Sequence, residues 1–476
     1  MQFRWNHTQG APDYDRETGF GFVTGAVYNA DAGLHIPETN SGFLPLWWYA
    51  GTPISDIRQS EYGLQATAAE ALRTEDTADR RLPVWLRIQV PGEGVYRAEI
   101  TVTGTDGGEV LVFTGRRRLA WRGVLPAGAQ QIVTAYCDVF PIVPRGQADA
   151  VASDAVNIAV VGGALSAVAL AEAPHTRRIW VCGDSTVTDQ TGELPYAPGT
   201  SYAGWGQMLP AYLPEVCITN HAHSGLTTES FLSEGHWAIV KPRLRAGDIC
   251  LFQFGHNDQK LAHLQARGGY TDRLRTYIKE TRTAGAVPVL ITPLARNSWR
   301  DPTHYNDFLA DFADAVLDLG KEEAVPVLDL HAYAMQLIRQ EGLETAKRWF
   351  YPGDYTHTND FGAYRMAGFV AGALGKAVGL PVADAPAWTP APPFAPLTPP
   401  KDCALPAPDT DPFADYDATR PQEVLTRAEA LELAIKALKL FPINVYNDLY
   451  ADLSLIHISE PTRLDVTSYA VFCLKK

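Results

Sequence analysis

The 476-residue chain has no apolar stretch approaching the roughly 20 residues that cross a bilayer, so no membrane span is expected. It also has no stripe rich in lysine and arginine. Its 40 basic residues are outnumbered by 54 acidic ones, which gives a net charge of -14. Nucleic acid is therefore not an expected partner, because binding to phosphates depends on clustered positive charge.

Paired cysteine motifs are missing as well, and no leader segment is expected. The six cysteines are scattered singly, without a CxxC or a Cys/His cluster of metal-ligand spacing, so we expect reduced, structural thiols and no metal site. Residues 1–7 lead into no apolar core, which argues against a secretory signal and predicts a cytoplasmic protein. A secreted or cell-surface location is the alternative, because a misassigned start codon would hide a signal.

The length predicts two to four domains, and the residue pattern changes near Glu172. Residues 1–172 contain short runs of alternating apolar and polar residues, such as 96–104 and 109–113, which indicate an antiparallel β-sandwich. The Trp-Trp-Tyr run at 47–49 suits a sugar-stacking platform in a carbohydrate-binding-like domain. The alternative is that these aromatic residues fill the core of the sandwich or the interface between domains.

Residues 173–380 alternate strand-like and helical segments. The apolar runs are short, as strands covered on both faces should be, and the helical segments space apolar residues by three and four. This alternation predicts a three-layer α/β domain with a parallel sheet. The predicted strands are 179–181, 216–220, 249–254, 287–292 and 325–330, and the helical spacings join Leu274 to Ile278 and Phe308 to Leu319.

Three further segments follow. Residues 381–421 are rich in proline and predict a semi-rigid linker. Residues 422–453 resemble part of an S-layer homology module, which implies contact with a cell-wall polymer and supports the cell-surface alternative. Residues 454–476 are interpreted as a non-native tail, because 454–463 resemble translated sequencing-adapter sequence, and they are left out of the fold.

Chemically useful residues follow the predicted strands. Ser185 comes after the first strand of the α/β region, Gly225 after the second and Asn257 after the third. Asp354 lies three residues before His357, a spacing that brings a carboxylate to Nδ1 of the imidazole and leaves Nε2 to face a serine. Because parallel strands present their carboxyl ends at one edge of the sheet, these residues are candidates for one hydrolytic site.

Four blocks in this order, Gly-Asp-Ser, a glycine after strand two, Gly-x-Asn-Asp and Asp-x-x-His, resemble the SGNH hydrolase superfamily, whose α/β domain is flavodoxin-like. The flanking residues are similar to those of the rhamnogalacturonan acetylesterase family in particular. The resemblance covers about residues 178–378. The matching segments are Gly183–Thr186, Gly204–Leu209, Gln253–Asp258 and Thr292–Arg296.

The resemblance implies a serine esterase that needs no metal or organic cofactor. It assigns Ser185 as nucleophile, His357 as base and Asp354 as the group that orients the imidazole. The backbone N–H groups of Ser185 and Gly225 and the side chain of Asn257 would form the oxyanion hole. The implied reaction is removal of acetyl groups from acetylated pectic polysaccharide or oligosaccharide of the rhamnogalacturonan type by two-step acyl transfer.

Substrate recognition depends on other residues. Leu226 stands after the block-two glycine, where the family usually has arginine or a similar polar residue. Arg296 and Arg300 suit the carboxylates of uronic acids, and the alternative is surface ion pairing with this acidic chain's own carboxylates. His256 either contacts substrate or packs beneath the nucleophile. The net charge of -14 slows encounter with anionic pectin, and less so with a short oligosaccharide.

The remaining titratable residues near these motifs are expected to be structural. Asp184 suits a turn in which an aspartate side chain bonds its own backbone, and Asp258 is interpreted in the same way. Four histidines belong to no comparable motif and are expected in the core or on the surface: His221, His223, His304 and His331.

Two rival functions stay open. One is another SGNH activity, such as acetylxylan deacetylation or lipase-like cleavage of longer acyl esters. The other is a non-catalytic carbohydrate-binding or cell-envelope protein, in which the flanking regions carry the function. Turnover that depends on Ser185 separates the two classes, and the preferred acyl chain separates the esterases.

Overall fold

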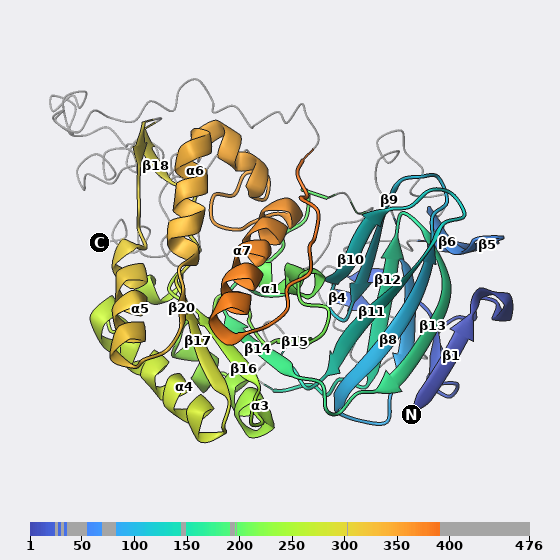
Figure 1. Ribbon diagram of the computed structural model, residues 1–476, viewed down its shortest axis with the longest axis horizontal. Helices are drawn as coiled ribbons and strands as arrows, with labels where there is room; N and C mark the ends of the chain where they lie inside the picture. Colours follow the sequence, from blue (N-terminus) through green and yellow to red (C-terminus); the bar gives the residue numbers. More distant parts are fainter. Residues whose placement is uncertain are drawn as a thin grey trace, which may run out of the picture.

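The computed structural model describes residues 1–23, 27–29, 33–35, 55–68, 82–143, 149–190, 196, 198–301 and 303–390. In these ranges a set of antiparallel sheets precedes an α/β unit that lies beside it (Figure 1). The predictions for the aromatic run 47–49, for most of the linker and for the segments 422–453 and 454–476 lie outside the described residues.

The strands up to Glu172 form two larger antiparallel sheets and one separate hairpin. They are β1 Gln2–Asn6, β2 Phe20–Phe22, β3 Val27–Asn29, β4 Gly33–His35, β5 Ser55–Ser60, β6 Gly63–Ala68, β7 Val84–Gln89, β8 Gly94–Thr103, β9 Glu109–Thr114, β10 Arg118–Val124, β11 Gln130–Val139, β12 Ala155–Val161 and β13 Ala164–Glu172. One sheet has the order β11-β8-β13-β6-β5, with β1 also paired to β13. The other has the order β10-β9-β12-β7-β2, and β3 pairs with β4.

A shared apolar cluster lies between the two larger sheets. It contains Ile100 of β8 and Val168 of β13 from the first sheet, together with Val112 of β9 and Ile158 of β12 from the second. The neighbouring residue Phe113 belongs instead to the core of the α/β unit. Since successive side chains of a strand point to opposite faces, the second sheet is buried on both of its faces.

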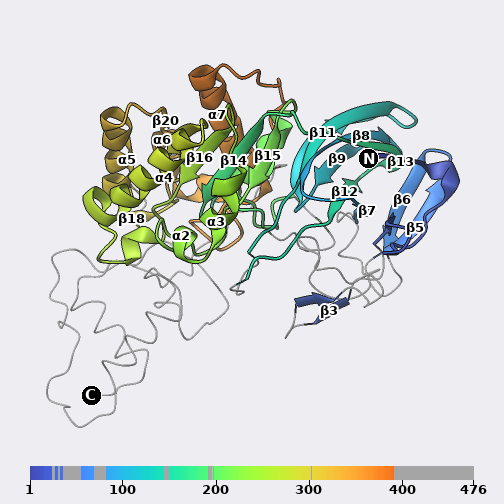
Figure 2. The ribbon, with the colours of Figure 1, turned by 90° about the horizontal axis from the view of Figure 1, so that it is seen from below.

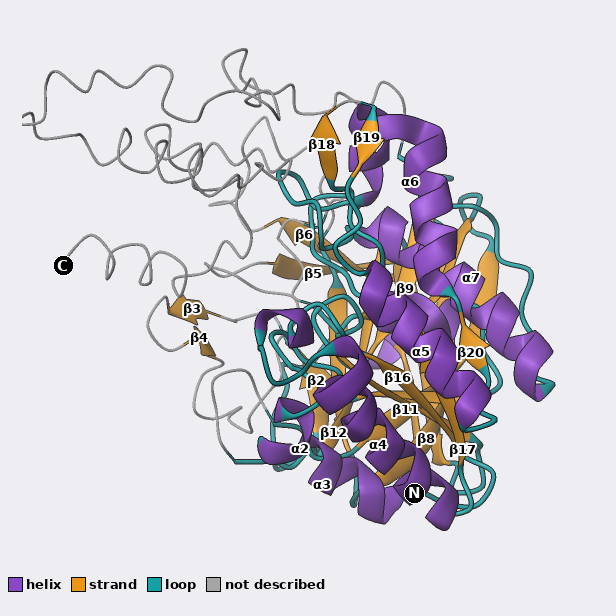
Figure 3. Cartoon of the chain, turned by 90° about the vertical axis from the view of Figure 1, so that its left-hand side faces the viewer, coloured by secondary structure: helices purple, strands orange, loops and turns teal. Residues whose placement is uncertain are grey.

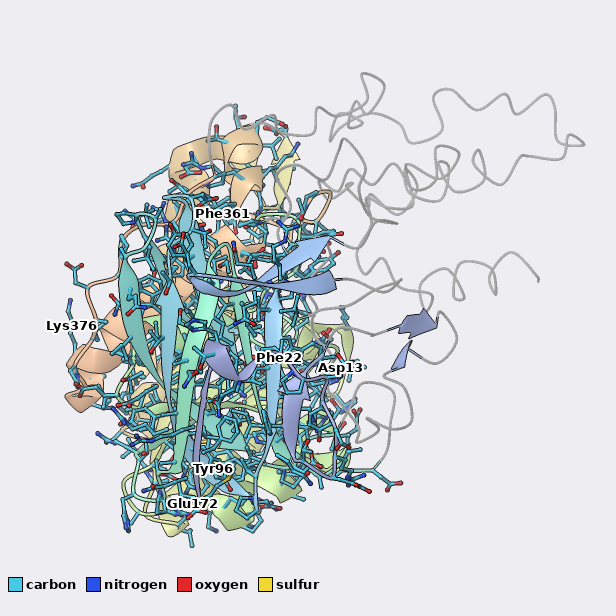
Figure 4. The ribbon with its side chains drawn as sticks, turned by 90° about the vertical axis from the view of Figure 1, so that its right-hand side faces the viewer. Asp13, Phe22, Tyr96, Glu172, Phe361 and Lys376 are labelled. Carbon is cyan, nitrogen blue, oxygen red and sulfur yellow. The ribbon has the colours of Figure 1, made fainter. Side chains whose placement is uncertain are left out.

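The register of the sheets can be followed in the view from their outer side. Tyr96 and Glu172 are paired across β8 and β13, and they lie at the lower end of the strands in Figure 4. Phe361, which belongs to the α/β unit, lies near the opposite end. The two larger sheets therefore extend alongside the α/β unit, and β11 lies beside a strand of its parallel sheet (Figure 2).

The α/β unit contains five parallel strands, as the alternating pattern predicts. They are β14 Arg178–Gly183, β15 Cys217–Asn220, β16 Ile249–Gln253, β17 Val287–Ile291 and β20 Val327–Leu328. Their order is β15-β14-β16-β17-β20, which is the flavodoxin-like order. Strand order reverses between β14 and β16, and in open α/β sheets the crevice beyond the carboxyl ends at such a point is where ligands bind.

Helices cover both faces of this sheet. They are α1 Trp205–Met208, α2 Ser230–Ser233, α3 His236–Val240, α4 Thr271–Thr283, α5 Ala310–Glu322, α6 Leu330–Ala346 and α7 Asp360–Val378. Ile179 and Val181 of β14 pack in one cluster with residues of α1, α6 and α7, whereas Trp180 and Cys182 pack in another with α3, α4 and α5 (Figure 3). In the described part of the chain, no helix is both long and apolar enough to span a membrane.

Two predicted boundaries in this unit are corrected. The fifth strand was expected over residues 325–330 but covers only Val327–Leu328, because the Asp329 side chain accepts a hydrogen bond from the Ala332 N–H and starts α6 at Leu330. Phe308 was expected in a helix but precedes α5, and its side chain is 38% exposed.

One ion pair in this unit makes stability depend on pH. His331 Nε2 lies 2.8 Å from Asp307 Oδ2, and Nδ1 lies 3.0 Å from the Pro293 carbonyl oxygen. Burial alone would lower the pKa of His331, but the hydrogen bond and charge of Asp307 outweigh it and raise that pKa above 6.5. Burial alone would likewise raise the pKa of Asp307, yet His331 holds it below 3.8.

We therefore expect Asp307→Asn to destabilise the protein most between about pH 4 and 6.5. The histidine's contribution is lost as pH rises through its raised pKa, and the aspartate's is lost as pH falls through its lowered pKa. Because Asp307 is partly exposed, the expected loss is about 1 to 2 kcal/mol at pH 5.5 and smaller at pH 9. Urea unfolding at both pH values measures it, and an equal loss at both would contradict the pairing.

Candidate active site

The turn that carries Ser185 follows directly after β14. The Asp184 side chain accepts hydrogen bonds from the N–H and O–H of Thr186, at 2.9 and 2.8 Å. Its carbonyl oxygen accepts from the N–H groups of Val187 and Thr188, at 3.2 and 3.1 Å. Asp184 therefore builds this turn with its own backbone neighbours and, as expected, has a structural position.

The motif Gly204–Leu209 supports the same turn from the side. A Cβ atom at Gly204 would lie 2.4 Å from the Thr188 carbonyl oxygen, so a larger residue cannot approach this closely. The indole N–H of Trp205 donates to Gln253 Oε1 at 2.7 Å, and Gln253 Nε2 donates to Thr186 Oγ1 at 2.7 Å. This chain of hydrogen bonds ties the turn to β16 and α1.

Three residues predicted from two separate motifs meet at this turn. Ser185 Oγ lies 2.8 Å from Nε2 of His357, although the residues are 172 positions apart. His357 Nδ1 lies 2.8 Å from Asp354 Oδ2. The Ser185 residue is 7% exposed and the His357 side chain 30% exposed, so the pair can be reached from solvent. This is the geometry of a nucleophile, a base and a group that orients the base.

The charge on Asp354 is fixed by its hydrogen bonds. Oδ1 accepts from the backbone N–H groups of Thr356 and His357, at 2.6 and 3.0 Å. Burial by itself would raise the pKa of Asp354, but His357 and these N–H donors hold that pKa below its usual range. The carboxylate therefore remains ionised and keeps a proton on Nδ1 of the imidazole.

The segment around His357 is anchored on both sides. The Tyr351 N–H donates to the His357 carbonyl oxygen at 2.9 Å. Thr358 Oγ1 donates to the Ala203 carbonyl at 2.6 Å, and the Ala203 N–H donates back to the Thr358 carbonyl at 3.0 Å. Asn359 then caps α7. The imidazole is thus positioned by the segment that leads into α1 as well as by its own connection to α7.

The candidate oxyanion groups lie on the two neighbouring loops. Gly225 has a φ of +89°, a conformation that favours glycine. Its loop starts beside the nucleophile turn, because the His223 N–H donates to the Gly183 carbonyl at 3.1 Å. Asn257 Nδ2 donates to the carbonyl oxygen of Leu226 at 3.0 Å, which joins the two loops. The oxyanion role of these groups stays a prediction.

The Asp258 side chain joins these two loops through hydrogen bonds. Its carboxylate accepts from the N–H and Oγ1 of Thr228, at 2.8 and 2.6 Å, and from the Gly255 N–H at 3.0 Å. Burial raises the pKa of Asp258 to about 6 against the opposing effect of the Thr228 bonds. These contacts agree with the expectation that Asp258 is a structural residue.

Removing the Asn257 amide is expected to slow the chemical step without loss of fold. Because one donor of an oxyanion hole contributes a factor of about 10² to 10³ to kcat, we expect Asn257→Ala to lower kcat by that amount while KM changes little. Steady-state kinetics on an acetyl ester measure it. Gln259→Ala, which removes the other side-chain amide of the same turn, serves as the control, and equal losses in both variants would contradict the assignment.

His256 lies beneath the nucleophile turn. It is 2% exposed, with Nδ1 at 3.2 Å from Asp184 Oδ2 and Nε2 at 2.9 Å from the Leu294 carbonyl oxygen. Both ring nitrogens are engaged within the protein, which favours the packing interpretation over contact with substrate. Leu226, the departure from the family pattern, is buried at 2% exposure, and only its backbone faces Asn257.

The two candidate arginines differ in their surroundings. Arg296 is 4% exposed, and its guanidinium carbon lies 5.8 Å from the centre of the Tyr355 ring, next to Asp354 in sequence. Arg296 is therefore buried, and the alternative of a surface ion pair does not apply to it. Arg300 is exposed, and its Nε lies 3.3 Å from Asn306 Oδ1. A contact of either residue with substrate stays a prediction.

Two tyrosines near His357 were not identified from the sequence. The rings of Tyr202 and Tyr351 stack with centroids 3.6 Å apart, and the Tyr202 ring is perpendicular to the His357 ring, with centroids 5.7 Å apart. Tyrosine is common in this chain, with 20 copies, and these two belong to no motif. Among the described residues, no group of three or more His, Cys, Asp or Glu side chains is placed to hold a metal ion.

Comparison with known proteins identifies similar esterases over part of the chain. Residues 181–365 match the GDSL-like Lipase/Acylhydrolase family. The rhamnogalacturonan acetylesterase RhgT of Bacillus subtilis is 33% identical over 222 residues, covering 44% of this chain and 93% of that protein. The probable rhamnogalacturonan acetylesterase YesY of the same organism is 33% identical over 215 residues, covering 43% and 95%. A crystal structure of YxiM from Bacillus subtilis, 21% identical, covers 79% of this chain and 99% of that one, with a TM-score of 0.41.

Proposed function

The chain belongs to the GDSL-like lipase/acylhydrolase (SGNH) family and is a carboxylic ester hydrolase, and from this premise we propose that it removes acetyl groups from acetylated rhamnogalacturonan or its fragments. The observation that carries the chemistry is the contact of Ser185 with His357 and of His357 with Asp354, both at 2.8 Å. The support for the substrate is that the two relatives above are named as acetylesterases of this polysaccharide.

The proposed reaction has two acyl-transfer steps. Ser185 Oγ bonds to the acetyl carbonyl carbon while Nε2 of His357 takes the hydroxyl proton. The tetrahedral intermediate then expels the sugar oxygen, which receives that proton, and acetyl-Ser185 remains. His357 next takes a proton from water, whose oxygen attacks the acetyl carbonyl carbon. His357 then returns that proton to Ser185 Oγ as the bond to the acetyl group breaks and acetate leaves. The ionised Asp354 stabilises the imidazolium in both steps.

The groups proposed to stabilise the oxyanion are the N–H of Ser185, the N–H of Gly225 and the Asn257 amide. Asn257 Nδ2 already donates to the Leu226 carbonyl oxygen, and its second proton is the one available to an oxyanion. Neutral donors held in place by Asp258 and the nucleophile turn need little reorganisation as negative charge develops.

The preceding region is interpreted as a β-sandwich that ends at β13. Its two antiparallel sheets share one apolar core, and the next strand, β14, begins only at Arg178. We accordingly place the division between the sandwich and the hydrolase between Glu172 and Arg178.

The experiment is acetate release by the full chain from acetylated rhamnogalacturonan and from acetylated xylan, side by side, with Ser185→Ala as control. The proposal predicts serine-dependent release that is faster from rhamnogalacturonan. Faster release from xylan would retain the mechanism and overturn the substrate. No serine-dependent release from either, together with turnover of longer acyl esters, would favour a lipase-like activity, and no turnover at all would favour the carbohydrate-binding interpretation.

A further inference from the structure

The β9–β10 hairpin of the N-terminal sheets inserts an arginine into the hydrolase. Arg117 lies at the turn of this hairpin and is fully buried, at 0% exposure. Its Nη1 lies 2.6 Å from Oδ1 of Asp360, which is also fully buried. Nε donates to the Gln190 carbonyl oxygen at 3.3 Å, and Nη2 donates to the carbonyl oxygen of Tyr202. One guanidinium group thus joins three segments of the hydrolase.

Each of the three segments leads to the catalytic residues. Asp360 is the first residue of α7 and follows His357 by three positions. Gln190 also donates, through Nε2, to the Ser185 carbonyl oxygen at 2.8 Å. The ring of Tyr202 contacts that of His357 at a right angle. The contacts of Arg117 therefore fix the start of α7 relative to the nucleophile turn, and these are the two segments whose spacing sets the Ser185–His357 distance.

Asp360 collects further bonds from the segment that precedes α1. Tyr196 Oη donates to Oδ1 at 2.9 Å, and the Gly199 N–H donates to Oδ2 at 3.2 Å. The Arg117 guanidinium also lies 5.8 Å from the centre of the Tyr196 ring. The ion pair between Arg117 and Asp360 is thus the centre of a polar network that connects the sandwich, the segment before α1 and α7.

The arginines on either side of Arg117 hold the neighbouring strand. Arg116 donates to the carbonyl oxygen of Asn220 and Arg118 to that of Ile218, both on β15. The two guanidinium groups also lie 3.0 and 3.4 Å from Oδ2 of Asp189, the residue before Gln190. The three arginines are therefore buried against the hydrolase, with at most 8% of each residue exposed.

The conformation of Arg117 is unfavourable for a residue other than glycine or asparagine. Its φ is +58°, in the left-handed region where glycine or asparagine is preferred at a turn. Burying a guanidinium group adds a desolvation cost that a solvent-exposed turn residue would avoid. Both features cost free energy at an arginine, and strained, buried polar residues of this kind are typically kept for a function of the site that they contact.

We propose that Arg117 is a positioning residue for the esterase reaction, through which the N-terminal sandwich holds the His357 segment in register with the Ser185 turn. This inference rests on the proposed function. It gives the sandwich a part in catalysis that does not require it to bind sugar.

The test compares Arg117→Met and Arg117→Lys with the wild type on a small acetyl ester, p-nitrophenyl acetate, which depends little on remote substrate contacts. Because small displacements of reacting groups slow the chemical step strongly, Arg117→Met is expected to lower kcat about 100-fold with KM within about twofold. Arg117→Lys keeps the charge and the backbone strain but cannot reach all three partners, so it is expected to recover part of kcat.

Arg87→Met is the matched control. Arg87 is 2% exposed, lies in β7 of the same sheet and pairs with Asp154 at 2.7 Å within the N-terminal region. Its loss should lower the melting temperature with kcat within about twofold of wild type. If Arg117→Met does not fold, Arg117→Lys becomes the test of the proposal. A kcat of Arg117→Lys equal to that of the wild type would then overturn the proposal.

The outcomes separate the two proposals. If turnover by the wild type depends on Ser185, two results would overturn the positioning proposal alone. One is an unchanged kcat in both Arg117 variants, and the other is an equal loss of kcat in Arg87→Met. Absence of Ser185-dependent turnover in the wild type would overturn the proposed function and the positioning proposal together.

Discussion

Ser185→Ala is expected to lower kcat by a factor of about 10⁴ to 10⁶ while the protein remains folded. The reason is that the oxygen atom 2.8 Å from His357 Nε2 is the one that would bond to the acetyl carbon. Without it no acyl-enzyme forms, and only the weak catalysis of the remaining oxyanion donors and substrate binding is left. Acetate release measures the loss, and mass spectrometry shows whether a fluorophosphonate probe still labels the protein.

Ser233→Ala provides the comparison for this variant. Ser233 is an exposed serine at the end of α2 and belongs to no part of the site. Its replacement should leave both kcat and labelling at the wild-type level. Labelling of the Ser185→Ala variant at the wild-type rate would mean that another residue is the nucleophile.

Asp354→Asn is expected to lower kcat by about 10⁴-fold near neutral pH. The asparagine oxygen can keep the bonds from the Thr356 and His357 N–H groups, so the loop should retain its shape. The amide N–H₂ would then face Nδ1 of His357, and the imidazole would carry its proton on Nε2, opposite Ser185. In that tautomer the histidine cannot accept the hydroxyl proton. The pH profile of kcat/KM and the melting temperature measure the chemical and structural effects separately.

Asp307→Asn is the matched control for Asp354→Asn, because it removes a carboxylate from a second Asp–His pair that lies outside the triad. It should reduce stability near pH 5.5 through His331 and leave kcat close to wild type at neutral pH. A large loss of kcat in Asp307→Asn, or wild-type kcat in Asp354→Asn, would contradict the assignment of Asp354 as the group that orients the base.

The sequence by itself was enough to predict the residues of the candidate site, because each side chain proposed to be catalytic belongs to a short motif whose spacing has a local cause. Ser185 follows a buried strand and an aspartate that builds its turn. Asp354 and His357 are joined across one turn of backbone. The alternation of apolar runs and helical spacings likewise predicted the parallel sheet, and the four blocks identified the family. Local patterns of this kind depend on residues within a few positions of one another.

Only the tertiary structure decided the connections between distant segments. The contact of Ser185 with His357 joins residues 172 positions apart, and the buried pair of Arg117 with Asp360 joins residues 243 positions apart. In the sequence, only the run Arg116-Arg117-Arg118 points toward the Arg117–Asp360 ion pair. In an isolated hairpin these three side chains would be exposed to solvent, so the run does not predict their burial. Whether a charge is buried or exposed depends on which surface folds against it, and no local pattern specifies that surface.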